Sequence, residues 1–373
     1  MSNDVHHISE IRKSSTEAPR SLRPIELPPL GDSSLVSVLV ANYNYAEYIG
    51  EAIESVLKQT YPHFEVVVCD DGSTDNSREV IAGYQKHDDR VRLVCQTNAG
   101  VSAALNTAYA ACRGEIISLL DADDIFHVTK LERVVRTFQA FPNSGLCLHR
   151  SQKINKIGRP FGYSSPIVFP HGWVGDQALH GGGRVQTMPQ ATALSFRRSV
   201  TDDLLFPIPT DLKRLADGYL CYSAQFFTEV CSISSTLAYI RDHGGNVSGL
   251  GIFTTQSVGR YLDDFEFLLG HIRRLLAAHY GEDISTQLKL EENSQYWSFL
   301  LALYVLGDER GGEIRGESVR HIVEHISPRR QQALASLLVA LPRPLGRLGI
   351  RFWNGRFPGS AVVTRVMRTL LRF

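Results

Sequence analysis

The stretch that decides the fold is Ile116-Ile117-Ser118-Leu119-Leu120-Asp121-Ala122-Asp123-Asp124, an apolar run that ends in three carboxylates. We predict a buried strand up to Leu120 that delivers these carboxylates to the rim of a sheet. A second acidic pair, Asp70-Asp71, closes the earlier strand-like run at 64–69 in the same way. Ligands of open α/β sheets bind at the carboxyl ends of the strands. The two acidic clusters therefore mark one candidate ligand site.

The surrounding sequence alternates between strand and helix patterns. The pattern predicts strands at 35–41, 64–69, 91–94 and 116–120, and helices at 46–57, 77–85, 102–111 and 130–140. Asn76 with Glu79, and Thr129 with Glu132, have the spacing of a capping box at a helix start. Such a βαβ series favours a mainly parallel sheet.

The alternating rhythm ends past Pro142, where short segments rich in Gly and Pro lead to an apolar stretch at 191–196. From about Thr255, apolar residues at helical spacing trace one continuous face. This periodicity predicts a helical extension, with further helices at 295–306, 318–326 and 328–341.

Composition excludes several classes of protein. The chain has 39 basic and 39 acidic side chains, which gives no basic excess for a nucleic-acid partner. Its six cysteines are scattered, without the spacing of a zinc knuckle. We find neither a signal peptide nor a run near the roughly 18 apolar residues of a spanning helix. We therefore expect a globular, cytoplasmic protein whose polar, proline-rich residues 1–34 form a disordered tail.

The end of the chain has an unusual charge pattern. Residues 329–373 contain nine arginines and no acidic residue, interleaved with Leu, Ile, Phe and Trp. This mixture suits peripheral contact with an anionic bilayer, which would place the protein at the inner face of the cell membrane. A solvated, poorly ordered tail fits the same composition equally well.

A divalent cation would reconcile the acidic clusters with a phosphate ligand. Carboxylates repel a nucleotide diphosphate, whereas Mg²⁺ or Mn²⁺ binds one or two carboxylates and fills its other positions with phosphate oxygens and water. Asn42-Tyr43-Asn44 after the first strand, and Asn98-Ala99-Gly100 after the third, offer a ring and amides at the same rim. We therefore predict a metal-bridged nucleotide diphosphate site.

Five motifs follow one another in this part of the chain: Val36 to Asn44, Ser55-Val56-Leu57-Lys58-Gln59-Thr60, Asp70-Asp71-Gly72-Ser73-Thr74-Asp75, Asn98-Ala99-Gly100 with Asn106, and Leu120 to Asp124. In this order they resemble the nucleotide-binding half of glycosyltransferase family 2, and a thinner likeness continues to about residue 250. The resemblance implies an α/β protein with the GT-A fold, in which helices flank a mainly parallel, Rossmann-like sheet. The helical extension lies outside the likeness.

The resemblance also implies an organisation of the chain. Residues 35–150 would form the nucleotide-sugar-binding half of the GT-A domain, and 151–250 the acceptor-binding, catalytic half. The helical periodicity and the charge pattern, independently of the resemblance, predict a helical extension at 251–327 and a basic amphipathic segment at 328–373.

Roles of single residues follow from the same resemblance. Tyr43 would border the nucleobase, Asp71 would hold the base or ribose, and Asp217 would be the catalytic base. Asp121 would lie near the ribose and the metal, Asp123 would be the principal metal carboxylate, and His243 would add a metal or diphosphate contact. The other predicted substrate-binding residues are Asn42, Asn44, Asp70, Asn98 and Gly100.

The function implied is that of an inverting, metal-dependent glycosyltransferase. It would move a sugar from a nucleotide-diphosphate donor, with a UDP-sugar favoured, to a hydroxyl of a cell-surface glycan or lipid-linked acceptor. One alternative is a sugar-nucleotide nucleotidyltransferase, although such enzymes normally have a basic glycine-rich loop where this chain has Ala41-Asn42-Tyr43-Asn44-Tyr45. Another is a non-catalytic nucleotide-sugar-binding module, which would not need Asp217.

Overall fold

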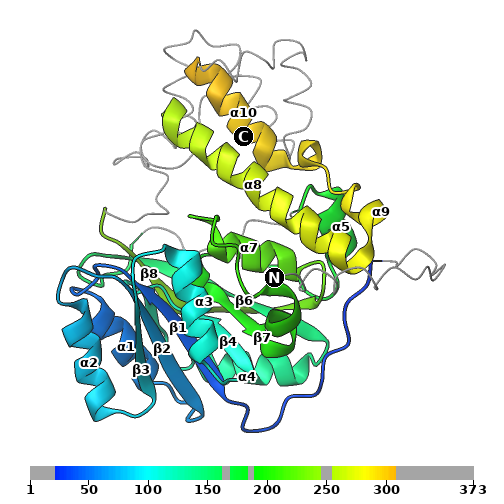
Figure 1. Cartoon of the computed structure of the whole chain (residues 1–373). Coiled ribbons are helices and arrows are strands. Elements are labelled where there is room, and N and C mark those ends of the chain that lie inside the picture. Colours follow the sequence, from blue (N-terminus) through cyan, green and yellow to red (C-terminus); the bar gives the residue numbers. More distant parts are fainter. Residues whose placement is uncertain (1–21, 162–168, 184–188, 245–253, 308–373) are drawn as a thin grey trace, which may run out of the picture.

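The computed structural model describes residues 22–161, 169–183, 189–244 and 254–307. Its centre is an eight-stranded sheet with the order β3-β2-β1-β4-β7-β6-β8-β5 (Figure 1). The strands are β1 Val36–Asn42, β2 Phe64–Asp71, β3 Val91–Gln96, β4 Ile116–Leu119, β5 Ile125–Phe126, β6 Ser144–Asn155, β7 Leu194–Arg197 and β8 Glu229–Asp242.

Helices cover both faces of this sheet. The α-helices of the described residues are α1 Ile49–Leu57, α2 Ser77–His87, α3 Val101–Ala111, α4 Lys130–Ala140, α5 Gly175–His180, α6 Arg198–Val200, α7 Ala216–Ala224, α8 Thr255–Tyr280, α9 Glu282–Ser285 and α10 Ser294–Leu306. Successive side chains of a strand point to opposite faces. Along β1, Leu39 accordingly joins a core covered by α3, α7 and α8, whereas Val38 and Val40 join a core covered by α1, α2 and α4.

The sheet has a parallel half and a mixed half. Strands β3, β2, β1 and β4 are all parallel, which confirms the βαβ interpretation of the first 120 residues. Strand β7 is antiparallel to both β4 and β6, and β8 runs parallel to β6. The prediction of short segments past Pro142 missed the long strands β6 and β8. Their polar residues and the register shifts between them obscure any alternating pattern in the sequence.

Residues 22–34 are not a free tail, which corrects the expectation that order begins at residue 35. The backbone N–H of Ile25 donates a hydrogen bond of 2.7 Å to the carbonyl of Phe227. Leu22 and Leu27 pack with Ile25 against the core on the α8 side. Scattered apolar residues in an otherwise extended segment are enough to hold it on a surface already built by the rest of the domain.

The predicted capping boxes are also corrected. In α2 and α4 as described, Asn76 and Thr129 make no side-chain cap hydrogen bond. Asp75 instead accepts from the first N–H of α2 at 3.0 Å, and Gln59 accepts from the second N–H of α4 at 2.9 Å. Neighbouring side chains thus satisfy helix starts that local spacing had assigned to the cap residues themselves.

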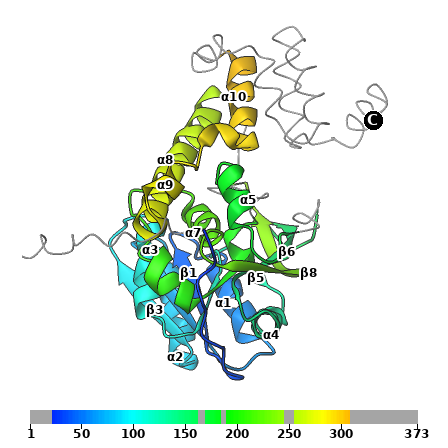
Figure 2. The same ribbon diagram turned by 90° about the vertical axis from the view of Figure 1, so that its right-hand side faces the viewer.

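The helical extension begins as predicted with α8, and α10 matches the predicted helix at 295–306. Figure 2 shows α8 and α10 reaching away from the sheet. Within the described ranges, no helix combines the length and apolar character needed to cross a bilayer. The helices predicted at 318–326 and 328–341, and the basic segment 328–373, lie outside the described residues.

Candidate active site

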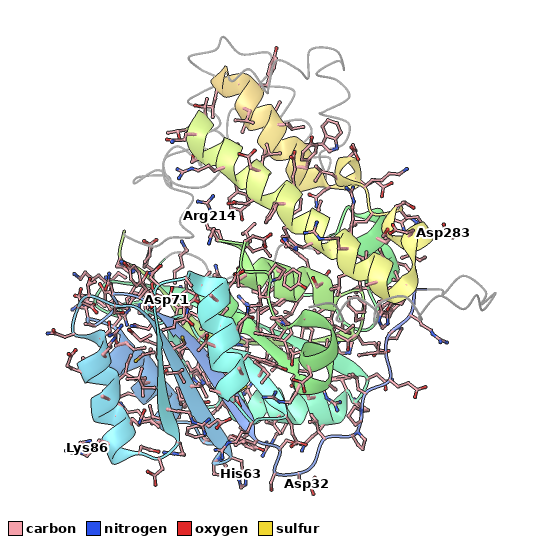
Figure 3. The ribbon with its side chains drawn as sticks, in the orientation of Figure 1. Asp32, His63, Asp71, Lys86, Arg214 and Asp283 are labelled. Atoms are coloured by element: carbon pink, nitrogen blue, oxygen red, sulfur yellow. The ribbon has the colours of Figure 1, made fainter. Side chains whose placement is uncertain are left out.

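The predicted site residues gather at the edge formed by the carboxyl ends of the parallel strands. Figure 3 shows Asp71 at this edge, the upper one in the view, and His63, which precedes β2, at the opposite edge. The register of β1 and β2 places Asn42 beside Asp70, and the Asp121 loop leaves β4, the other neighbour of β1. The parallel half of the sheet therefore brings both acidic clusters to one edge.

Asp70 is fully buried and shapes the loop after β2. Its Oδ1 accepts from Asn42 Nδ2 at 2.9 Å. Its Oδ2 accepts from Arg78 Nε at 2.7 Å and from the N–H of Ser73 at 3.1 Å. Burial raises the pKa of this carboxyl, but the hydrogen bonds from Ser73, Arg78 and Asn42 outweigh it and leave the pKa lowered. Asp70 is therefore an ionised carboxylate whose oxygens are occupied within the protein.

Asp71 holds the loop that starts α3. Its Oδ1 accepts from Gln96 Nε2 at 2.7 Å and from the N–H of Ala99 at 2.8 Å, and its Oδ2 accepts from the N–H of Gly100 at 2.8 Å. Gly72 has a φ of +75°, and a Cβ there would lie 2.7 Å from the backbone nitrogen of Asn98. Only glycine permits this approach, so the predicted residues Asn98 and Gly100 are fixed against Asp71.

The loop after β1 lies against the same turn. Asn44, with a φ of 59°, accepts from the N–H of Thr74 at 2.7 Å. The Tyr43 ring beside it is 45% exposed. The buried Oδ1 of Asn42 has no hydrogen-bond partner among the described residues. This corner thus combines an exposed aromatic ring with an unused buried acceptor.

The three carboxylates after β4 differ in burial and in the groups that contact them. Asp124 is buried and accepts from Thr192 Oγ1 at 2.6 Å and from the N–H of Arg241 at 2.8 Å. Asp123 Oδ2 lies 3.1 Å from His243 Nε2, and the Asp121 side chain has solvent access. The structure therefore brings Asp123 and His243 together from β4 and the end of β8.

The charges of this cluster act on one another. Burial raises the pKa of Asp124 to about 8, with the charge of Asp123 as the next cause. Protein surrounds Asp121 densely despite its solvent access, so desolvation and the charges of Asp124, Asp123 and Asp217 raise its pKa well above the usual value. Burial and the charges of Asp123, Asp121 and Asp124 raise the pKa of Tyr45 to about 12. Such crowding of like charge is relieved by a cation.

Asp217 lies in the first turn of α7, and its charge is among the causes that raise the pKa of Asp121. Asp217 Oδ1 accepts from the N–H of Gly218 at 2.9 Å, and desolvation raises the pKa of Asp217. Leu215, which precedes the helix, has a φ of 62° in the left-handed region. A carboxyl with a raised pKa in a partly covered site is a common feature of catalytic acids and bases.

Two buried basic side chains that the sequence analysis missed, Arg241 and Lys130, lie beside the acidic loop. Arg241 donates from Nε to the carbonyl of Asp123 at 2.8 Å. Lys130 donates from Nζ to the carbonyl of Thr192 at 2.7 Å and lies 3.4 Å from the Phe126 ring centre. Lys130 is fully buried although it starts a helix whose first turn is ordinarily solvated. Its position six residues after Asp124 was the available signal.

Gln59 and Asn106, which belong to the five motifs, hold segments together through side-chain hydrogen bonds. Gln59 donates from Nε2 to the carbonyl of His127 at 2.9 Å and caps α4, so it fixes the chain that follows Asp124. Asn106 of α3 donates to the carbonyl of Ile208 at 2.8 Å and accepts from its N–H at 2.7 Å. Both side chains connect the donor-side motifs to segments far along the sequence.

Comparison with known proteins identifies the family. The model of "Glycosyl transferase family 2" matches residues 37–204. An uncharacterised glycosyltransferase of Nostoc sp. is 32% identical over 274 residues, which cover 70% of this chain and 82% of that protein. The chain belongs to glycosyltransferase family 2. It is therefore a glycosyltransferase, and the alternatives of a nucleotidyltransferase or a binding module give way to this assignment.

Further relatives match parts of this glycosyltransferase. The putative teichuronic acid biosynthesis glycosyltransferase TuaG of Bacillus subtilis is 39% identical over 100 residues, 26% of this chain and 40% of that protein. Chondroitin synthase of Escherichia coli is 34% identical over 150 residues, 40% of this chain and 22% of that protein. This chain spans less than half of either relative.

A solved structure supports the GT-A fold. S. aureus TarS 1-349 in complex with UDP-GlcNAc superposes with a TM-score of 0.51 at 18% sequence identity, over 87% of this chain and 93% of that chain. The mixed sheet flanked by helices is the architecture of this glycosyltransferase as well.

The divalent metal that the family implies fits the residues present. Within the described ranges, no group of three or more His, Cys, Asp or Glu side chains is arranged as a complete metal site. Mg²⁺ and similar ions, however, need only one or two protein carboxylates and take their other ligands from phosphate and water. Asp121 and Asp123 supply crowded carboxylates with raised pKa values, and His243 lies beside Asp123.

Proposed function

We propose that this family member is an inverting, metal-dependent glycosyltransferase that moves a sugar from a nucleotide diphosphate to an acceptor hydroxyl. One observation carries the proposal: the parallel register brings both acidic clusters to one edge of the sheet. The charge of Asp217 is among the causes that raise the pKa of Asp121, which supports a candidate base near a candidate metal carboxylate. Inversion needs a single base on the acceptor side while the diphosphate departs from the opposite face of the sugar.

The donor nucleotide would bind at the corner built by β1, β2 and the loop before α3. The exposed Tyr43 ring could stack against a base, and Asn42 offers its unused acceptor nearby. Asp71 would act through the Asn98-to-Gly100 loop that it fixes, and Asn44 and Asp70 would shape the facing turn. A UDP-sugar is the favoured donor, in keeping with the UDP-GlcNAc bound by TarS.

Mn²⁺ or Mg²⁺ would be held by Asp121 and Asp123, with His243 as a further ligand. When bound, the ion neutralises negative charge that grows on the leaving diphosphate. Arg241 and Asp124 hold the loop on which Asp123 lies, since Arg241 donates to the carbonyl of Asp123 and to Asp124. The protein thus fixes the carboxylates in advance.

Asp217 would remove the proton from the acceptor hydroxyl. Desolvation raises its pKa, which makes the ionised carboxylate a stronger base than an exposed aspartate. General base catalysis of this kind contributes about 10² to 10⁴ in rate. The N–H of Gly218, which donates to Oδ1, orients the carboxylate without saturating it.

The acceptor would be a growing cell-surface polysaccharide or a lipid-linked glycan. TuaG and the chondroitin synthases, among the relatives, are named for the synthesis of such polymers. A cytoplasmic location at the inner face of the cell membrane would follow from contact through the basic segment 328–373. Sedimentation with anionic liposomes tests this contact: we expect the full chain to bind and a chain ending at Ser327 not to bind.

A thermal-shift screen of UDP-glucose, UDP-N-acetylglucosamine, UDP-galactose and GDP-mannose, with and without Mn²⁺, tests the donor. A ligand at 100 times its Kd raises the stability of the folded state by about 2.7 kcal/mol. We expect one donor to raise the Tm only with Mn²⁺. Asp217→Asn should keep this shift and lose turnover, whereas Asp283→Asn, on α9 far from the site, should keep both (Figure 3). Wild-type turnover by Asp217→Asn would refute the base assignment.

A further inference from the structure

Helix α8 packs directly on α7, the helix that carries Asp217 (Figure 1). The family model ends at residue 204, so both helices follow the segment that it matches. Their contact is close, since a Cβ built at Gly218 would lie 3.6 Å from Leu268 Cδ2 of α8. Leu268 is fully buried in this contact. The start of α7 therefore depends on α8 for its packing.

A bidentate ion pair joins α8 to Arg214, two residues before the start of α7. Arg214 Nε lies 2.7 Å from Asp264 Oδ2, and Arg214 Nη2 lies 3.0 Å from Asp264 Oδ1. Figure 3 shows Arg214 between the upper edge of the sheet domain and α8. Two parallel N–H···O bonds fix direction as well as distance, because both groups are planar.

The residue after Arg214 has a backbone conformation that needs such support. Leu215 has φ 62° and ψ 28°, a left-handed conformation that costs energy for a residue with a branched side chain. Conformations of this kind persist only where surrounding contacts impose them, and they gather at functional sites. Release of Arg214 would allow Leu215 to relax and α7 to begin at a different angle.

The other end of the same segment is fixed to α3. Ser102 Oγ donates to the carbonyl of Leu212 at 2.6 Å, and Asn106 pairs with the backbone of Ile208 through two hydrogen bonds. The segment from Ile208 to Leu215 is thus held by the donor-side helix at one end. Two polar contacts connect the segment to α8: the bidentate Arg214–Asp264 pair, and Asp211 Oδ1, which lies 3.2 Å from His271 Nε2.

We propose that Arg214 and Asp264 are positioning residues that set the place of the Asp217 carboxylate relative to Asp121. The helical extension, through Asp264, then forms part of the catalytic architecture. This inference rests on the proposed role of Asp217 as the base. A base displaced by about 1 Å can lose on the order of 10² in rate.

The chain offers a matched control for this ion pair. Arg90 and Asp88 also form a bidentate pair, in which Arg90 Nε lies 3.0 Å from Asp88 Oδ1 and Arg90 Nη2 lies 2.7 Å from Asp88 Oδ2. Their side chains are 40% and 24% exposed, against 40% and 23% for Arg214 and Asp264. The control pair lies in the loop between α2 and β3, at the opposite edge of the sheet.

The test compares Arg214→Ala, Asp264→Asn, the charge-swapped double variant Arg214→Asp/Asp264→Arg, and Arg90→Ala. Nucleotide release is measured with the sugar nucleotide ranked first in the thermal-shift screen, with water as the acceptor. We expect kcat to fall about 10- to 100-fold in both single variants while the donor KM stays within about twofold. The swapped variant should recover part of kcat, and Arg90→Ala should keep the wild-type kcat.

Hydrogen exchange provides a readout that needs no substrate. Amide hydrogens of residues 208–217 should exchange faster in Asp264→Asn than in wild type, and at the wild-type rate in Arg90→Ala. Wild-type kcat in both single variants, with Asp217→Asn inactive, would overturn the positioning role and leave the base intact. A rise of donor KM that matches the fall of kcat would overturn it too. Full activity of Asp217→Asn would instead refute the proposed base.

Discussion

The donor half and the acceptor half of the site are held in different ways. On the donor side, Asp70 and Asp71 each accept three hydrogen bonds from residues on neighbouring strands and loops. On the acceptor side, Asp217 follows Leu215, which is left-handed, and Arg214, which forms an ion pair with Asp264 of α8. Helix α8 packs on α7 but comes later in the chain. The difference indicates that the proposed nucleotide site is held by a dense local network, whereas the position of the proposed base depends on a few long-range contacts.

The largest expected effect concerns the donor side. Asp123→Ala removes the carboxylate nearest to His243, and we expect it to abolish the Mn²⁺-dependent rise in Tm with a nucleotide sugar. Turnover should fall by about 10²-fold or more, because the metal contributes several kcal/mol of charge stabilisation. Calorimetric titration with Mn²⁺ and UDP checks the binding step. Unchanged metal-dependent binding would contradict the assignment of Asp123.

Asp71→Asn tests whether the donor corner is built in advance. An amide nitrogen cannot accept a hydrogen bond, so at least one of the N–H groups of Ala99 and Gly100 loses its partner. We expect a loss of about 1–3 kcal/mol in urea unfolding and a raised donor KM. Asp88→Asn, which also loosens a turn, should lower stability without changing KM. An unchanged donor KM in Asp71→Asn would show that the loop does not shape the site.

Tyr43 should make a smaller contribution, since its ring is only partly covered in the free protein. Tyr43→Ala should weaken donor binding by about 1 kcal/mol, roughly fivefold in KM, through lost stacking with the base. Tyr43→Phe keeps the ring and should stay within about twofold of wild type. Equal effects of the two substitutions would argue for the hydroxyl instead of the ring.

Replacement of Asp217 should have a small effect on stability, and the pH dependence of that effect tests the burial of the carboxyl on the acceptor side. The folded state raises the pKa of Asp217, so it binds a proton more tightly than the unfolded chain. Stability therefore decreases as pH rises from the unfolded pKa to the raised folded pKa. Asp217→Asn should accordingly raise the Tm at pH 7 by roughly 1–3 °C. The gain should vanish below the unfolded pKa, near pH 4, and a Tm difference that stays constant with pH would contradict this account.

Much of the donor half could be predicted because its information is local. The predicted strands and helices up to residue 140 match the observed bounds within about three residues, since each has its own apolar periodicity, whereas the two-residue strand β5 was not predicted. The same motifs predicted that Asn42, Asp71 and Asp121 would meet at one edge, and the parallel register brings them there. Parallel strands put their carboxyl ends together whatever the details of packing.

The sequence by itself thus determined the family, the parallel half of the sheet and the edge at which the acidic motifs gather. Tertiary structure alone decided that Asp70 points inward, that Lys130 is buried, and that residues 22–34 lie against the core. It also decided the pairing of β6 with β8 and of Arg214 with Asp264. These contacts join residues far apart in the chain, and burial of a charged group depends on all the elements around it. No local pattern of residues records such a collective property.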